Sequence, residues 1–419
     1  MANRILTPKA IAREVLAQLE NKLVMAAKVN TNFSTEFGNV GDTVDVRRPQ
    51  RFVGQSNNLD ITNYNEDIVD ANIPVTLKKT ETIKFKLTAL QRTLEITDQR
   101  VQQDIIRPAV TQLKNRVETE IGMLYKHVFH FSGTAGTVPS TFKSLGLVDA
   151  MMTDHAVPED DRCAFHNTTT SLELADTLKN VYVQGKARTA LEKVAIGEYG
   201  GLMNYKSVHV PVHTVGAHAG TPLVNGANQN VQYDGTDPID STKKIGDLNR
   251  QTLVTDGWSN SVTGLLKQGD VFTIAGVHAV NPLTRVSTGR LQTFVVRADA
   301  DSNGSGQATL EISPAIISTG QWQTVDAAPA DNAAITVVSG AAGSQRPQSL
   351  IIHPDAFTLV SRPIKIDSDS FETATVSGNR TSIAVSKKTN FNNLDHECRL
   401  DMLFDTVCIY ADMAQRLTA

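Results

Sequence analysis

The residues best suited to chemistry lie between Glu159 and His166, where carboxylates precede a thiol and an imidazole. A cysteine close to a histidine can act as a nucleophile whose proton the imidazole removes. The carboxylates, however, follow a proline in a predicted loop, and the cysteine lies in the run RCAFHN, which favours a buried strand. We therefore predict a structural role for this cluster, which consists of Glu159, Asp160, Asp161, Arg162, Cys163 and His166.

Potential metal ligands occur in one further place, at His209, His213 and His218. Residues four apart on a strand share a face, so two of these side chains could approach one metal ion. No fourth ligand follows at a suitable spacing, and we interpret the three histidines as ordinary polar positions. The glycines in 303–306 lack the Lys-Ser/Thr of a phosphate-binding loop and predict a hairpin turn instead. The sequence predicts neither an enzyme nor a cofactor or metal site.

Three arginines, Arg47, Arg48 and Arg51, form the most concentrated basic group. They could contact phosphate. In a chain with a net negative charge, we favour two other interpretations, namely that they pair with carboxylates of a neighbouring subunit or that they stay solvated.

The composition is that of a folded protein, with 40% hydrophobic and 20% charged residues. The 419 residues predict two or three domains. A net charge of −4 argues against a dedicated nucleic-acid binder, although it permits a basic inner surface. The three cysteines form no C-x-x-C pair, and no apolar run is long enough for a signal peptide or a membrane span. We expect a reducing cytoplasm and no membrane.

The N-terminal third alternates between helical and extended patterns. Apolar residues four apart predict an amphipathic helix over residues 8–29. Residues 40–86 read as a long extended hairpin with a polar middle, and such hairpins serve as contacts. Apolar steps of three to five residues predict a helix over 98–131, about 50 Å long, kinked at Pro108.

The remainder of the chain is mixed, then all-β, then mixed again. Helices and strands mix over 142–215, and from 223 to 345 short strand patterns separated by Gly, Asn and Asp predict an all-β region. The mixed pattern returns after residue 346. An α+β domain is therefore interrupted by a β domain.

The order of these parts resembles the major capsid protein of tailed bacteriophages, with the Hong Kong 97-type fold, in the podovirus coat branch that carries an inserted β-barrel domain. The strings that carry the resemblance are IGEYGGLMNYKSVHVPVHTVG at 196–216, GDVFTIAGVHAVNPLT at 269–284 and CRLDMLFDTVCIYADMAQRL at 398–417. The resemblance implies an N-terminal arm at 1–35, an E-loop at 36–80, a P-domain with a spine helix at 81–139, an A-domain at 140–222, the inserted barrel at 223–345, and a return to the A- and P-domains at 346–419.

The resemblance also implies a function and partners. The chain would self-assemble as hexamers and pentamers into an icosahedral shell around double-stranded DNA, with a scaffolding protein and a portal protein. It would reside in the virion after assembly in the bacterial host cytoplasm. A charged loop of the insert would reach a neighbouring subunit, and we place it at Asp237, Asp240, Lys243, Lys244 and Asp247.

Two alternatives remain open. A β region rich in Asn, Asp and Thr could bind carbohydrate, but sugar sites need aromatic platforms, and aromatic residues make up only 5% of the chain. A shell protein of an encapsulin-like nanocompartment would share the fold, although it would usually lack the β insert.

Overall fold

In the computed structural model, the chain forms two compact units. Unit 1 combines 1–44, 75–122 and 357–407, and unit 2 combines 45–74, 123–356 and 408–419. No helix in the described part of the chain is long and apolar enough to cross a membrane. The structure describes residues 8–32, 43–47, 51–54, 66, 68, 72–87, 105–178, 197–232, 239, 250–364, 366, 372–390 and 395–418.

Unit 1 contains a five-stranded sheet with helices packed on it. The strand order is β16-β19-β18-β17, and β3 pairs with β19. Alternation places Ile83 and Phe85 of β3 on one face and Lys84 and Lys86 on the other. The elements are α1 (Pro8–Lys22), η1 (Ala26–Lys28), β3 (Lys79–Leu87), α4 (Arg107–Met123), β16 (Phe357–Arg362), β17 (Glu372–Ser377), β18 (Ser382–Thr389) and β19 (His396–Cys408).

The amphipathic helix predicted over 8–29 is confirmed as α1 in its first part, but it ends at Lys22, and only the short turn η1 follows within the predicted range. Its four predicted apolar positions, Ile11, Val15, Leu19 and Leu23, are buried, and α1 packs against β17 and β18. Pro8 is its first residue, where a missing N–H costs no helical hydrogen bond.

The predicted helix over 98–131 is wrong at its C-terminal end. The α-helix α4 covers Arg107–Met123, about 26 Å, and η4 (Leu124–His127) then tightens the chain before an extended segment. Residues 98–104 lie outside the described residues. Pro108 is the second residue of α4 and follows a wider π-helical turn at 105–106, so the proline marks a change of helix type.

The extended hairpin predicted over 40–86 is described only in part, because 40–42, 48–50, 55–65, 67 and 69–71 lie outside the described residues. A two-stranded sheet pairs β1 (Thr43–Arg47) with β2 (Asn72–Thr76). The alternating residues that follow form β3 and pair with β19, from Leu87↔His396 to Lys79↔Phe404. The second alternating run therefore belongs mainly to the body of unit 1, because its apolar face has a sheet to complete.

Unit 2 contains a seven-stranded mixed sheet with two helices. Its order is β4-β20-β15-β5-β7-β6, with β8 paired to β15. Leu145, Val148 and Met152 form the buried face of α5, whose first turn is capped by Thr141. The elements are β4 (Phe131–Ser132), α5 (Phe142–Asp154), β5 (Cys163–His166), α6 (Thr168–Leu178), β6 (Gly197–Tyr199), β7 (Leu202–Lys206), β8 (Val212–Thr214), β15 (Gln345–Ile352), η5 (Pro354–Ala356), η6 (Ala411–Met413) and β20 (Ala414–Thr418).

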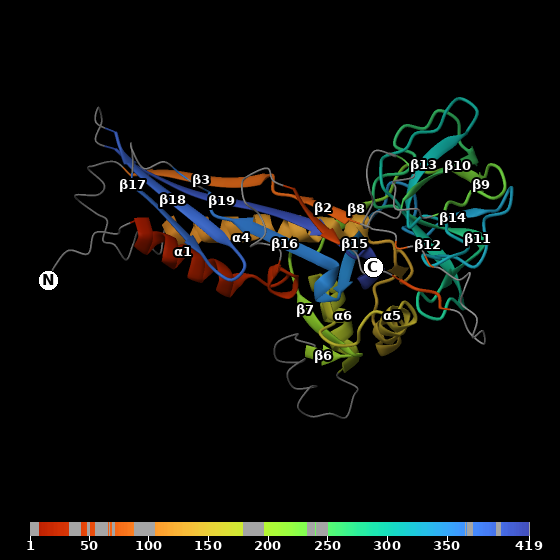
Figure 1. Ribbon diagram of the computed structural model, residues 1–419, viewed down its shortest axis with the longest axis horizontal. Coiled ribbons are helices and arrows are strands. Elements are labelled where there is room, and N and C mark those ends of the chain that lie inside the picture. The colour runs from red at the N-terminus through yellow and green to blue at the C-terminus, as the bar shows by residue number, and fades with distance from the viewer. Residues whose placement is uncertain are drawn as a thin grey trace. The chain divides into compact units, whose positions relative to one another are not determined.

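The β region predicted within 223–345 is a six-stranded antiparallel barrel of unit 2 (Figure 1). Its order is β14-β11-β12-β13-β10-β9, and the bridge Leu223↔Ala334 joins the two ends of the sheet. Phe272 and Phe294 stack at its centre, with ring centroids 5.7 Å apart. The strands are β9 (Gly220–Val224), β10 (Gln251–Trp258), β11 (Val271–Val280), β12 (Ser287–Val296), β13 (Ala308–Ser313) and β14 (Ile335–Val337).

Candidate functional site at the root of the barrel

The cysteine and histidine of the first cluster do not form a nucleophile and base. Cys163 Sγ donates to the carbonyl oxygen of Asp161 at 3.2 Å, whereas His166 Nε2 lies 2.9 Å from Asn204 Oδ1. All four residues of β5 are buried, which confirms the predicted strand. Burial lowers the pKa of His166 to about 4, so its imidazole is neutral at neutral pH.

The three predicted histidine positions separate in the structure. The backbone N–H of His209 donates to Ser207 Oγ, and His218 Nε2 donates to the carbonyl oxygen of Gly340. His213 alone points into a polar network. Among the described residues, no group of three or more His, Cys, Asp or Glu is arranged to hold a metal ion.

The barrel leaves the mixed sheet through two strands that pair with each other. The entry strand β8 and the exit strand β15 are antiparallel, with Gln345 opposite Thr214 and Pro347 opposite Val212. Just beyond β8, the N–H of Val215 donates to Ser344 and the N–H of Gly343 donates to Gly216. We call this pair of strands the stalk.

A buried network centred on Asp270 lies beside the stalk. Its Oδ1 is 2.8 Å from His213 Nε2 and accepts from Ser339 Oγ at 3.1 Å. Its Oδ2 accepts from the backbone N–H groups of Gly216 at 2.9 Å and Lys267 at 2.7 Å. The carboxylate at the start of β11 thus binds both stalk and barrel.

The network continues from His213 to the helix that precedes the mixed sheet. Tyr125 in η4 places its hydroxyl 2.9 Å from His213 Nδ1. Because an ionised carboxylate can only accept, His213 Nε2 carries the proton that faces Asp270, and in the neutral ring Nδ1 accepts from Tyr125. The alternation in β8 turns His213 inward between two exposed or half-buried neighbours.

Arg416 of β20 closes the network from the other side. It is completely buried, its Nη1 donates to the carbonyl oxygen of Gly269 at 2.9 Å, and its guanidinium lies over the rings of Tyr125 and Phe131 at 5.6 and 5.7 Å. Rings that face a cation stabilise it electrostatically. Burial lowers the pKa of Arg416 to about 10, against the opposing effects of Tyr125 and Asp270, so the side chain stays charged at neutral pH.

The geometry of Gly269 is needed for this contact. Its φ is +102°, a backbone conformation that residues with a side chain rarely adopt. A Cβ at this position would lie 3.3 Å from His213 Cε1 and 3.4 Å from His213 Nδ1. Glycine therefore allows the barrel backbone to approach the histidine closely enough for Asp270 to reach it.

The Asp270 network has the properties of a structural attachment. Burial alone would raise the pKa of Asp270, but hydrogen bonds from His213 and from the N–H groups of Lys267 and Gly216 outweigh it and lower the pKa. Burial raises the pKa of Tyr125 to about 12, so the hydroxyl stays protonated. An Asp-His-Tyr series could resemble a nucleophile triad, but a buried hydroxyl with a raised pKa is a poor nucleophile.

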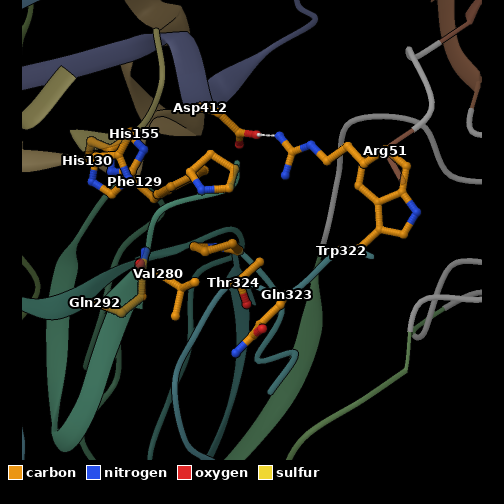
Figure 2. Close-up of a pocket in the computed structure, with 12 residues that line it drawn as sticks. Arg51, Phe129, His130, His155, Val280, Gln292, Trp322, Gln323, Thr324 and Asp412 are labelled. Atoms are coloured by element: carbon orange, nitrogen blue, oxygen red, sulfur yellow. Dashed lines mark hydrogen bonds and ion pairs between the residues drawn. The ribbon is translucent and has the colours of Figure 1, made fainter. Parts of the chain in front are cut away.

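The predicted contact residues are only partly described. Arg51 Nη2 pairs with Asp412 Oδ2 at 3.2 Å, and its guanidinium lies 5.2 Å from the ring centroid of Trp322 (Figure 2). Both partners belong to its own chain. Arg47 ends β1, and Arg48 lies outside the described residues. The loop positions Asp237, Asp240, Lys243, Lys244 and Asp247 also lie outside them.

Reasoning from the sequence missed another polar anchor, Glu118 of α4. This carboxylate is completely buried and accepts from the backbone N–H groups of Val24 at 2.7 Å, Met25 at 3.0 Å and Ala26 at 3.4 Å. It therefore fixes the chain that leaves α1. A signal was present, since a charged residue occupies the buried face between Val117 and Ile121.

Comparison with known proteins identifies a family. The family model described as P22 coat protein, gene protein 5, matches residues 2–417. No curated protein matches the chain.

Solved structures from phages are also similar to the chain, two of those given below over most of its length and one over the part that contains the barrel. A structure titled Mycobacterium phage Che8 is 11% identical, with 94% of this chain and 91% of that chain covered and a TM-score of 0.47. The capsid of Ralstonia phage GP4 is 9% identical, with 94% and 88% covered and a TM-score of 0.45. The CUS-3 coat protein I-domain is 30% identical over 29% of this chain and 98% of that chain, with a TM-score of 0.21. Because the family model spans the chain from before α1 to the last strand, the protein belongs to the P22 coat protein family.

Proposed function

We propose that this capsid protein uses its barrel as an internal brace, fastened to the mixed sheet by the Asp270 network. The capsid role follows from the family, whose members are structural coat proteins that self-assemble into a virion shell. Neither the sugar-binding nor the nanocompartment alternative is favoured by that membership. The observation that supports the brace is the single carboxylate that binds the stalk at His213 and Gly216 and the barrel at Lys267 and Ser339.

The shell that we propose is icosahedral, built from hexamers and pentamers around double-stranded DNA. Repeated modest contacts become collectively strong when a shell closes. Assembly would take place in the bacterial host cytoplasm with a scaffolding protein and a portal protein. Contact with DNA through phosphates needs no large basic excess if charges of opposite sign segregate to the two shell faces.

Assembly without a catalytic step is part of this proposal. The thiol and imidazole of β5 are engaged in buried hydrogen bonds, as described above. Burial also raises the pKa of Cys398 to about 11, which disfavours the reactive thiolate.

The domain boundaries implied by the resemblance remain part of the proposal, as do the contact residues. We propose that Arg47, Arg48 and the loop positions Asp237, Asp240, Lys243, Lys244 and Asp247 contact neighbouring subunits. Arg51 pairs with Asp412 within its own chain, and a contact of Arg51 with a neighbouring subunit stays part of the proposal.

The test is electron microscopy of the purified protein, alone and with a candidate scaffolding protein from the neighbouring reading frame. Closed shells or polymeric tubes are expected, and monomers under both conditions would overturn the proposal. The brace is tested by Asp270→Ala, with Glu159→Ala, at an exposed carboxylate of unit 2, as the control. We expect the Asp270 variant alone to lose shell yield, and an equal yield from both variants would contradict the brace.

A further inference from the structure

Two histidines of unit 2 lie ring against ring at the edge of a small cavity (Figure 2). The ring centroids of His130 and His155 are 3.8 Å apart, and the ring planes are inclined by 33°. His130 immediately precedes β4 and is 5% exposed, whereas the half-buried His155 caps the C-terminal end of α5. Within the described ranges, neither imidazole donates or accepts a hydrogen bond.

The cavity beside the pair is lined by both halves of unit 2. The two histidines line it from the side of the mixed sheet, and Gln292 of β12 and Trp322 line it from the side of the barrel. Its volume is about 40 Å³, which holds only a few water molecules. A charge that appears on either ring therefore meets little solvent as long as the cavity is closed.

Charged groups from several elements act on the pair. Asp412 of η6 attracts a proton to either ring, and its Oδ2 pairs with Arg51 Nη2 at 3.2 Å. Asp154 of α5 acts on His155 in the same sense, and Arg290 of β12 acts in the opposite sense. Arg290 Nη2 lies 3.6 Å from Asp154 Oδ2. Both carboxylates near the pair are thus already paired with an arginine.

Both imidazoles are neutral at neutral pH. Burial lowers the pKa of His155 to about 4, and burial together with the neighbouring ring holds the pKa of His130 well below its usual range near 6.5. A histidine with a lowered pKa stabilises the closed arrangement fully above about pH 6.5, and this stability is lost as the pH falls towards the folded-state value. Two charged rings so close together would also repel each other.

We propose that protonation of the histidine pair draws Asp412 away from Arg51 and opens this cavity to solvent. The imidazolium gains a carboxylate as its hydrogen-bond acceptor, while Arg51 loses its ion pair. The pair is therefore an acid-sensitive latch within the subunit, and it does not depend on shell formation. The Asp270 network should stay intact over the same range, because hydrogen bonds outweigh burial and lower the pKa of Asp270, which stays charged above about pH 4.

Opening is measured with Gln292→Cys, which places a thiol on the cavity wall. Gln292 is 3% exposed, so this thiol reacts with 4,4′-dithiodipyridine only when the cavity opens, and Val254→Cys, at a 41% exposed position of β10, gives the unprotected rate. The ratio of the two rates should rise about twenty-fold between pH 7 and pH 5, because the pKa of His155 is about 4 instead of about 6.5. The buried natural cysteines report unfolding and should react more slowly. A constant ratio would overturn the proposal.

Two variants in the Gln292→Cys background test whether the pair is the cause. His155→Gln cannot be protonated and should lose the acid acceleration. His218→Gln, at a half-buried histidine of the same unit that donates to the Gly340 carbonyl oxygen, should keep it. Equal acceleration in the two variants would refute the role of the pair.

The change of partner at Asp412 is tested separately in the same background. Arg51→Gln leaves the Asp412 charge to the imidazolium, so the acceleration should begin at a higher pH than in the parent. Asp412→Asn removes that charge, and the acceleration should begin at a lower pH. An unchanged onset in both variants would refute the change of partner. Val280→Cys, on the same cavity wall, replaces Gln292→Cys if the latter does not fold.

Discussion

Replacement of Asp270 should destabilise the barrel more than any other single carboxylate substitution in it. Asp270→Ala removes the acceptor that His213, Ser339 and the N–H groups of Gly216 and Lys267 share. It also removes a negative charge that partly offsets the cost of burying the charged Arg416 side chain. Breaking a buried charged cluster from one side costs about 3–5 kcal/mol of unfolding free energy.

Asp270→Asn should be much milder. Its amide oxygen can still accept from Gly216 and Lys267, and its NH₂ group would then face His213 Nε2. The histidine can change tautomer, accept at Nε2 and donate from Nδ1 to the Tyr125 oxygen. We expect a loss of about 1–2 kcal/mol for this variant, mainly from the lost charge.

The assay is urea unfolding followed by tryptophan fluorescence. Trp258 and Trp322 are the only tryptophans, and both are buried within 223–345, so the signal reports opening of the barrel. With a slope of about 2 kcal/mol/M, the midpoint should fall by about 2 M for the alanine variant. The lowered pKa of Asp270 means that its contribution is complete above about pH 4 and is lost as the pH falls through the folded-state pKa.

Two results would refute this reasoning. A midpoint for Asp270→Ala equal to that of the surface control Glu159→Ala would show that the network does not hold the barrel. Equal losses for the alanine and asparagine variants would show that His213 cannot change tautomer as described.

Three further predictions concern individual positions. Glu118→Ala should increase hydrogen exchange at the amides of 24–26 roughly thirty-fold, equivalent to about 2 kcal/mol. Glu118→Gln should increase the exchange less, because one side-chain oxygen can still accept. Unchanged exchange in the alanine variant would show that Glu118 does not hold this backbone segment. The pKa of His166, about 4 when folded and about 6.5 when unfolded, means that the unfolded chain binds more protons on acidification. Between pH 7 and 5 the folded state should lose about 2 kcal/mol through this residue, and the variant His166→Gln should show a correspondingly flatter pH dependence in urea unfolding. Gly269→Ala should cost about 1–3 kcal/mol in thermal unfolding. Gly320→Ala, at a φ of +93° but with no atom within 4 Å of the added Cβ, should cost less, and equal costs would show that contact with the histidine ring is unimportant.

Individual helices and strands of this fold could be predicted because the residue patterns that indicate them lie within a short stretch of sequence. Spacing by four predicted α1, and alternation between turn residues predicted β10 through β14. The helix over 98–131 was extended too far because Leu124 and Val128 continue the apolar period. Both side chains are buried in the core, but Leu124 lies in η4 and Val128 in the extended segment that follows it. Their burial therefore did not indicate a continuous α-helix.

The Asp270 network could not be predicted in the same way. Tyr125 and His213 are 88 residues apart, His213 and Asp270 are 57 apart, and Gly269 and Arg416 are 147 apart. No local period links such positions. His213 was considered as a metal ligand and then interpreted as an ordinary polar position. That interpretation is wrong for His213, which is buried between a carboxylate and a phenol that the sequence does not show as its neighbours.

The stalk explains why a barrel inserted in this way needs a buried network at all. Two paired strands resist separation along their hydrogen bonds but bend easily across them, so a barrel held only by β8 and β15 could swing about Gly216 and Gly343. Asp270 binds the Gly216 N–H and His213 on one side and two barrel residues on the other, which removes that freedom. Arg416 adds a second attachment, from the strand that pairs with β15 to the Gly269 carbonyl oxygen. With one attachment on β8 of the stalk and another on β20, which pairs with β15, the barrel and the mixed sheet should move as one body, and a load on the barrel should reach β20.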